Sequence, residues 1–212
     1  MRVRAVAAAL LLLSLVLAPP TYPDGLPPAG RPPAGRLPAG RLSPARAERI
    51  IAGRAGAVVR ALKQRDTTTL ARFVHPDRGV RFSPSVFLEK GEGRTFTRAQ
   101  VRRLSADRTR YLWGHHDGSG EPMRLRFSDY YKRFVFPRDF TRARKVLYNT
   151  PTQRGNTRKN TFSVHPRAIH VEYYLPQTAP DKAYDWASLN LIFEQKNGVW
   201  YLVGIVHDGW TI

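Results

Sequence analysis

The C-terminal stretch of the chain constrains its fold most strongly, because it has the pattern of a long antiparallel hairpin. Two apolar, β-rich runs, about Ser188–Glu194 and Val199–His207, flank the dipeptide Asn197-Gly198. Asn-Gly accepts positive φ at both central positions of a tight type I′ turn, which suits the twist of the strands it joins. The hairpin has the densest apolar content outside the N-terminus, so we expect it to form the centre of a sheet.

The first 42 residues have the composition of a targeting segment followed by a spacer. Two arginines precede an apolar run, Ala5–Ala18, which is shorter than the ~20 residues that span a bilayer comfortably. Residues 1–18 are therefore predicted to be a signal peptide that exports the protein to the periplasm or the cell exterior. Pro19 would hinder cleavage, so an uncleaved N-terminal membrane anchor is the alternative. Residues 19–42 repeat a Pro-Ala-Gly-Arg pattern, which predicts a disordered linker.

The composition excludes several kinds of site and leaves the partner open. The chain has no cysteine, which rules out disulfides, Cys-ligated zinc, iron–sulfur clusters and thiol catalysis. It carries 35 Lys+Arg against 16 Asp+Glu, a net charge of +19. This basic protein could attract anionic envelope polymers, acidic lipids or nucleic acid, although GC-rich codons also favour arginine. Export argues against nucleic acid as a specific partner.

Residues 43–212 are predicted to form a single α+β domain. Apolar residues at helical spacing predict a helix over 44–65, and Asp66 is placed to cap a second helix over 67–74. Thr97 and Gln100 match a capping box that opens a third helix, ending near Asp107. Further expected elements are a helix at 129–136 and strands at 80–82, 112–113, 123–127, 161–164 and 168–175. This order predicts N-terminal helices packed on a curved antiparallel sheet.

Two motifs and a middle segment carry a resemblance to a known group of proteins. The motifs are Ala61–Asp66 followed by His75–Pro84, and the ending Trp200–Ile212; the middle segment is Leu112–Tyr131. Together they resemble exported bacterial proteins whose function is not established, many of them lipoproteins. The layout of that group is similar to nuclear-transport-factor-2-like (NTF2-like, SnoaL-like, cystatin-like) α+β domains. This chain departs from the lipoprotein members because it lacks the cysteine that would be acylated.

The resemblance implies a cone formed by a bent antiparallel sheet facing a long helix, with a pocket inside. Such folds host isomerases, dehydratases, cyclases and non-enzymatic binding modules, so the fold does not decide the function.

The catalytic candidates are histidines and charged residues near the expected mouth of the cone. His207 and Asp208 end the last strand, where a histidine and a carboxylate could supply a general base. The alternative is that both hold the C-terminal loop through backbone hydrogen bonds. His75 and Arg81 flank a Pro-Asp-Arg-Gly turn, where Arg81 could bind a carboxylate or phosphate through two hydrogen bonds. A purely structural turn is the alternative for both.

Three further groups have weaker support. Glu172 shares a strand face with His170 and Tyr174, and it is the best carboxylate for acid–base chemistry if that face lines the pocket; a solvated sheet face is the alternative. Asp185 and Trp186 could provide a charge and an aromatic wall for a ligand, or anchor a loop.

Aromatic and basic residues alternate at 130–134, where Tyr130 and Phe134 at helical spacing favour one buried stripe over a base-stacking surface. The six histidines show no zinc spacing, so neither a metal nor a cofactor is predicted.

The sequence therefore favours an exported, envelope-associated binding domain that is non-enzymatic. Its partner would be a small ligand, an envelope protein or an anionic polymer. An isomerase or hydrolase using a His/carboxylate pair in the cone pocket is one alternative. Binding of an anionic polymer through an Arg-rich face is another.

Overall fold

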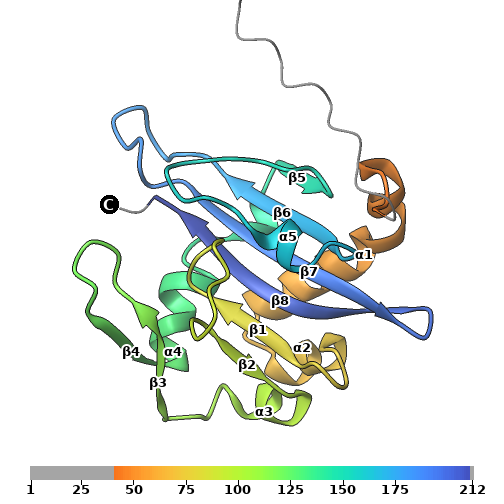
Figure 1. The fold of residues 1–212 in the computed structure, drawn as a ribbon, viewed down its shortest axis with the longest axis horizontal. Coiled ribbons are helices and arrows are strands. Elements are labelled where there is room, and N and C mark those ends of the chain that lie inside the picture. The colour runs from red at the N-terminus through yellow and green to blue at the C-terminus, as the bar shows by residue number, and fades with distance from the viewer. Residues whose placement is uncertain (1–40, 211–212) are drawn as a thin grey trace, which may run out of the picture. The chain divides into compact units, whose positions relative to one another are not determined.

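The computed structural model describes residues 41–210, so the predicted signal peptide and linker residues 19–40 lie outside the described residues. A six-stranded sheet forms the body of the described part, and the long helix α1 (Pro44–Lys63) crosses one of its faces (Figure 1). The α+β class with N-terminal helices on a curved sheet is confirmed. Within residues 41–210, no helix has both the length and the apolar character needed to cross a bilayer.

Three helices begin where the sequence predicts, and two of them, α2 and α3, have the predicted side-chain caps. α1 starts with Pro44 in its first turn, and its buried side chains, including Ile51, Val58 and Leu62, recur at helical spacing. In α2 (Thr67–Phe73), the side chain of Asp66 accepts a hydrogen bond from the Thr69 amide. Both hydrogen bonds of the capping box are present in α3 (Arg98–Arg103), although this helix ends before the predicted residue 107.

The C-terminal hairpin is the centre of the sheet, as expected. The strand order is β2-β1-β8-β7-β6-β5, and β7 and β8 lie in the middle. Asn197 and Gly198 have φ of 49° and 79°, the positive values that a type I′ turn requires. The strands are β1 (Val80–Ser83), β2 (Arg94–Phe96), β5 (Lys145–Tyr148), β6 (Ile169–Leu175), β7 (Ala187–Lys196) and β8 (Val199–Gly209).

The sheet is mixed rather than wholly antiparallel, which corrects the prediction for one pair of strands. β1 runs parallel to β8, with Arg81 beside Gly204 and Ser83 beside Val206. These strands lie far apart in the sequence, so no local pattern indicates the direction in which they pair. Parallel pairing needs a long crossover, and here everything between β1 and β8 provides it.

Both faces of the sheet are covered. On β6, the side chains of Ile169, Val171, Tyr173 and Leu175 face the main core, as predicted. The opposite face carries a second apolar cluster. Its members are Val86, Leu88, Ala168, Ile192, Val203 and Val206. Figure 1 shows the segment between β5 and α5 (Thr161–Val164) running over this outer face.

A separate hairpin, β3 (Arg110–His115) and β4 (Pro122–Arg126), packs beside the main sheet. Trp113 of β3 stacks on Tyr130 with ring centroids 3.6 Å apart. Tyr130 ends the short helix α4 (Phe127–Tyr130), which continues as the π-helix η1 (Tyr131–Val135) and is followed by the 3-10 helix η2 (Phe140–Arg142). Tyr130 is buried and its ring lies 5.2 Å from that of Phe134, so the two rings pack together as expected, although Phe134 is only half-buried.

Three segments differ from their predicted secondary structure, of which one is β2, a strand where a polar loop was expected. Residues 161–164 form the short helix α5 rather than a strand, and the amides of Ser163 and Val164 both donate to the carbonyl of Asn160. A segment of four residues, Thr-Phe-Ser-Val, is too short to be assigned to helix or strand by periodicity alone. Conversely, β5 was not predicted, because its short segment shows no clear alternation; it exists through its pairing with β6.

Candidate functional site

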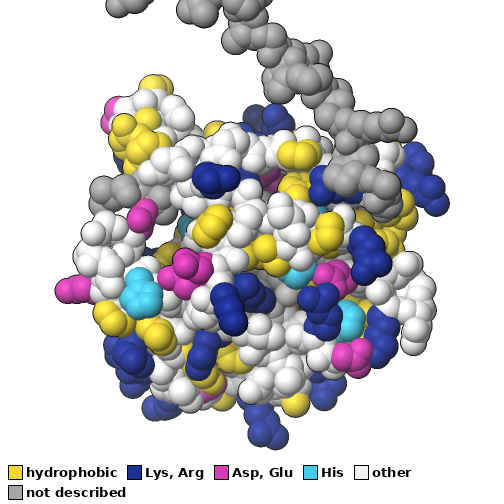
Figure 2. All heavy atoms as spheres, viewed as in Figure 1, with side chains coloured by type: hydrophobic (Ala, Val, Ile, Leu, Met, Phe, Trp, Pro, Cys, Tyr) yellow, Lys and Arg dark blue, Asp and Glu magenta, His cyan; other side chains and the backbone are white. Residues whose placement is uncertain are grey.

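A cleft of about 940 Å³ opens at the C-terminal end of β8. β1 accompanies β8 only as far as Ser83 beside Val206, whereas β8 continues to Gly209. The cleft lies where that pairing stops, and Figure 2 shows a hollow at the left edge of this face. Its walls come from residues 84–92, the β3–β4 hairpin at 115–117 and Met123, η1 at Arg133 and Phe134, the loop at 156–158, and residues 207–210.

His207 brings an uncharged imidazole to the cleft. Its ring meets Phe134 edge to face, with centroids 5.6 Å apart. Burial lowers the pKa of His207 to about 4, against a smaller raising effect of the Phe134 carbonyl, so the ring is neutral at pH 7. Its Nδ1 atom is buried and has no hydrogen-bond partner within residues 41–210.

Asp208 lines the same cleft but points to the other face of the sheet, because neighbouring residues of a strand alternate. Its carboxylate lies 2.6 Å from the ammonium of Lys159, and both side chains are buried. Burial raises the pKa of Asp208 to about 6, although Lys159 acts in the opposite direction. His207 and Asp208 therefore do not make the direct contact that a catalytic pair would need. His207 packs against Phe134, and Asp208 pairs with Lys159.

Glu172 is the centre of a buried charge cluster on the outer face of the sheet. Its carboxylate accepts hydrogen bonds from Thr152 at 2.6 Å and Ser188 at 2.7 Å. It also forms ion pairs with Arg154 at 3.1 Å and Lys159 at 3.6 Å. The alternative that this face is solvated is wrong, because the loop between β5 and α5 covers it and carries Arg154 and Lys159.

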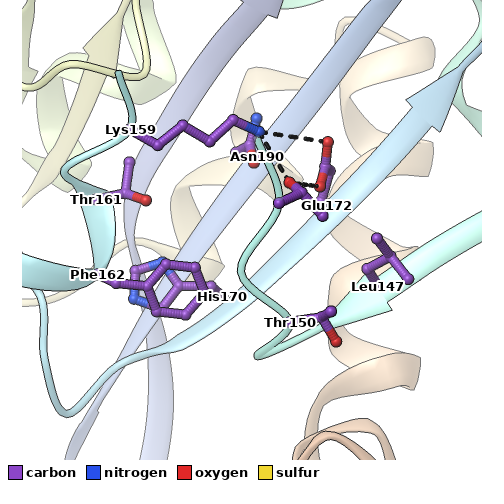
Figure 3. A pocket seen from close by; sticks show the side chains of 9 residues that line it. Leu147, Thr150, Lys159, Thr161, Phe162, His170, Glu172 and Asn190 are labelled. Atoms are coloured by element: carbon purple, nitrogen blue, oxygen red, sulfur yellow. Dashed lines mark hydrogen bonds and ion pairs between the residues drawn. The ribbon is translucent and has the colours of Figure 1, made fainter. Parts of the chain in front are cut away.

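The pKa of Glu172 follows from these contacts. Burial raises it, but Lys159, the two hydroxyl groups and Arg154 together outweigh burial, so the pKa lies below its ordinary value. Lys159 thus bridges two buried carboxylates from different strands, Glu172 on β6 and Asp208 on β8. Figure 3 shows Lys159 reaching across to Glu172.

A small cavity of about 10 Å³ lies beside this cluster, with Lys159, Glu172, Asn190 and His170 among its lining residues (Figure 3). His170 stacks on Phe162 with centroids 4.0 Å apart, and its Nε2 atom contacts the His165 carbonyl at 3.0 Å. Burial lowers the pKa of His170 to about 4. The cavity is the size of one water molecule, so it does not admit a substrate.

His75 and Arg81 both have structural contacts, His75 in the turn that they flank and Arg81 in the loop that follows β1. The Nδ1 atom of His75 accepts hydrogen bonds from the amides of Asp77 and Arg78, at 3.2 and 3.1 Å. The guanidinium of Arg81 donates to the carbonyls of Glu92, at 2.6 Å, and Glu89. Arg81 therefore holds the loop that forms one wall of the cleft, and its side chain does not line the cleft.

Asp185 and Trp186 lie outside the cleft. Asp185 accepts a hydrogen bond from the Thr178 amide at 2.9 Å and another from the Thr178 hydroxyl, which closes the loop before β7. Trp186 is buried with its ring 6.3 Å from that of Tyr174. Of the seven candidate residues from the sequence, the structure brings only His207 and Asp208 to the cleft.

Several cleft residues were missed by the sequence reasoning. Phe87 and Trp210 are large aromatic side chains that line the cleft and stay exposed. Outside the cleft, Lys159 of the buried charge cluster was also missed, because it lies in a polar loop with no motif around it. Glu92 lines the cleft 3.4 Å from the Nδ1 atom of His115, and neither residue was a candidate from the sequence. Within residues 41–210 no group of three or more His, Cys, Asp or Glu side chains is placed to hold a metal ion.

The fold and the cleft together define an α+β domain with an open, mixed polar and aromatic cleft. Neither a family model nor a curated protein matches the chain. A solved structure that is similar to it is a putative calcium/calmodulin dependent protein kinase II association domain from Xanthomonas campestris. The two share 14% sequence identity over 76% of this chain and 85% of that chain, with a TM-score of 0.31. A similarity of this size carries no argument about function.

Proposed function

We propose that this protein is an exported, envelope-associated binding domain of NTF2-like type that takes a small organic ligand in the cleft at the end of β8. The observation that carries the proposal is the combination of a cleft of about 940 Å³ with two large aromatic side chains that line it and remain exposed, Phe87 at 43% and Trp210 at 42%. Exposed apolar side chains gathered at a concave site are typical of binding surfaces.

The aromatic surface extends beyond the cleft itself. Tyr184 is 64% exposed, and its ring lies 4.4 Å from that of Trp210. The half-buried ring of Phe134 adds further apolar surface to the lining, whereas Met123 lines the cleft but is itself buried. A ligand with an apolar body would therefore bury several side chains that are otherwise in contact with water, which favours binding through the hydrophobic effect.

Binding without catalysis is supported by the positions of the acid–base candidates. His75 and Arg81 are engaged in backbone contacts, and Glu172 is held by four partners beneath the β5–α5 loop. In the cleft, His207 and Asp208 point to opposite faces of β8. A His/carboxylate isomerase or hydrolase would need these groups to converge on one substrate atom.

A ligand-detected NMR screen of small aromatic and aliphatic compounds against the purified protein tests this proposal. A compound that binds the wild-type protein shows a change in its own NMR signals when the protein is added. Most of this change should be lost with the variants Phe87→Ala and Trp210→Ala. The control is Val199→Ala, which removes an exposed apolar side chain of β8 outside the cleft. Binding that survives both aromatic changes, or that fails equally in the control, would contradict the proposal.

Export is tested separately by fusing residues 1–42 to a reporter enzyme that is active only outside the cytoplasm. Activity of the fusion supports export, and its absence contradicts it. The mass of the exported fusion distinguishes a cleaved signal peptide from an N-terminal anchor that stays uncleaved because Pro19 follows it.

A further inference from the structure

We infer that the cleft selects an organic cation, meaning an amine or guanidinium group carried on an apolar body. This inference rests on the proposed function, because it names the chemical class of the ligand that the cleft takes. It follows from the charges of the lining, the exposed aromatic rings and the uncharged imidazole of His207.

The charge of the lining departs from that of the whole protein. The chain carries 35 Lys+Arg against 16 Asp+Glu. In the cleft the balance is reversed, because four carboxylates face two guanidinium groups, those of Arg133 and Arg158. The four carboxylates are those of Glu89, Glu92, Asp117 and Asp208. Figure 2 shows acidic and histidine side chains near the hollow, while Lys and Arg side chains spread over the rest of this face.

Three of these carboxylates form no ion pair with Lys or Arg within residues 41–210. Glu89 and Asp117 are exposed, and Asp117 accepts one hydrogen bond, from the Gly118 amide at 3.2 Å. Glu92 meets His115 at 3.4 Å, and the guanidinium of Arg81, which binds its carbonyl, also partly balances the charge of its carboxylate. Asp208 differs, because Lys159 already pairs with it. The exposed wall of the cleft therefore offers negative charge that a ligand can neutralise.

The aromatic rings strengthen this preference. A cation over the face of an aromatic ring is attracted by its quadrupole, most strongly for tryptophan. The guanidinium of Arg133 already lies over the Phe134 ring, with its central carbon 5.1 Å from the ring centroid. Phe87 and Trp210 have no cationic partner in residues 41–210, and although Tyr184 packs against Trp210, both rings keep exposed surface for a ligand. Aromatic rings beside carboxylates suit a cation with an apolar body.

His207 fits the same class of ligand. It lines the cleft, and its neutral ring adds no positive charge there. The net charge of +19 on the whole chain would favour an anion at long range. Within a cleft, however, the lining charges dominate, because screening at physiological salt acts over about 8 Å.

Three compounds that share a phenyl ring and a two-carbon tether test the inference: phenethylamine, 2-phenylethanol and 3-phenylpropionate. The indole N–H signal of Trp210, identified by its loss in Trp210→Phe, reports binding in ¹H–¹⁵N spectra of the purified full chain. We expect phenethylamine to bind about tenfold more tightly than the alcohol, and the carboxylate to bind most weakly. The double variant Glu89→Gln/Glu92→Gln should remove this preference, whereas Glu48→Gln, an exposed acid on α1, should leave it intact.

The outcomes separate the two proposals. The cleft binds ligands but the inferred cation class is wrong if the alcohol or the carboxylate shifts the Trp210 signal at a concentration equal to or lower than that needed for phenethylamine. The class is also wrong if none of the three compounds shifts this signal while other compounds from the screen do. If nothing shifts it, the proposed function itself fails. A preference for the amine that persists in the double variant would show that the carboxylates do not cause it.

Discussion

The ammonium of Lys159 lies 2.6 Å from the carboxylate of Asp208, joining the loop between β5 and α5 to the last strand of the sheet. The two side chains are only 9% and 1% exposed, so water screens this ion pair poorly. The neighbouring residues 156–158 line the cleft, as does Asp208 itself. One buried ion pair therefore holds two walls of the proposed binding cleft together.

Removing Lys159 should destabilise the fold strongly. The variant Lys159→Met leaves Glu172 and Asp208 buried with only Arg154 to balance them, and an uncompensated buried charge costs about 3 kcal/mol or more. We expect a loss of about that size in urea unfolding at pH 7. The control is Lys196→Met, because the ion pair of Lys196 with Asp77 is exposed and should contribute less than about 1 kcal/mol. Equal losses in the two variants would contradict the role of Lys159.

Asp208 should make the stability fall as the pH rises. Its pKa is raised from 3.8 to about 6 in the folded protein, chiefly by burial. The folded state therefore holds a proton on this group more tightly than the unfolded chain does. The resulting stabilisation is fully present below the unfolded pKa and is lost as the pH rises through about 6.

The variant Asp208→Asn tests this, because its amide stays neutral. Between about pH 4.5 and 7.5, its stability relative to the wild type should improve by on the order of 2 kcal/mol. The buried histidines titrate in both proteins, so their contribution to the pH dependence of stability cancels when the two are subtracted. A stability difference that does not change with pH would show that Asp208 has an ordinary pKa.

The imidazole of His207 should resist protonation. Burial lowers its pKa to about 4, so in this case the unfolded chain binds the proton more tightly. The stability contribution of His207 is therefore present above the unfolded pKa of about 6.5 and is lost as the pH falls toward 4. An NMR titration of its ring protons, assigned by comparison with His207→Gln, should show a midpoint near pH 4. A midpoint near 6.5 would mean that the ring is solvated.

Gly79 should tolerate no side chain. Its φ is +68°, and a Cβ atom there would lie 2.4 Å from the carbonyl oxygen of Phe96. The variant Gly79→Ala should therefore lose about 2 kcal/mol or more in thermal or urea unfolding. Gly118 is the matched control, because it also has positive φ (+80°) but nothing within 4 Å of the added atom, so Gly118→Ala should lose only about 1 kcal/mol. Equal losses would mean that the backbone contact is not the cause.

The elements that the sequence predicted are those held by neighbours along the chain. The Asp66 cap and the Thr97–Gln100 capping box use bonds within three residues, and the Asn197-Gly198 turn depends on its own φ values. The alternation on β6 likewise assigned one face to the core. These features need no knowledge of the rest of the molecule, because the atoms that stabilise them are adjacent in sequence.

The site was decided by tertiary structure. Glu172 looked solvated from its strand pattern, yet a loop with no motif buries it by placing Lys159 and Arg154 over it. The same loop places Lys159 against Asp208. The cleft lies where β1 stops beside Val206 while β8 continues. Which segments cover a sheet face, and where one strand ends beside another, depends on contacts between distant parts of the chain. The sequence determined the hairpin at the centre of the fold, and the packing around its last residues determined what the protein offers to a ligand.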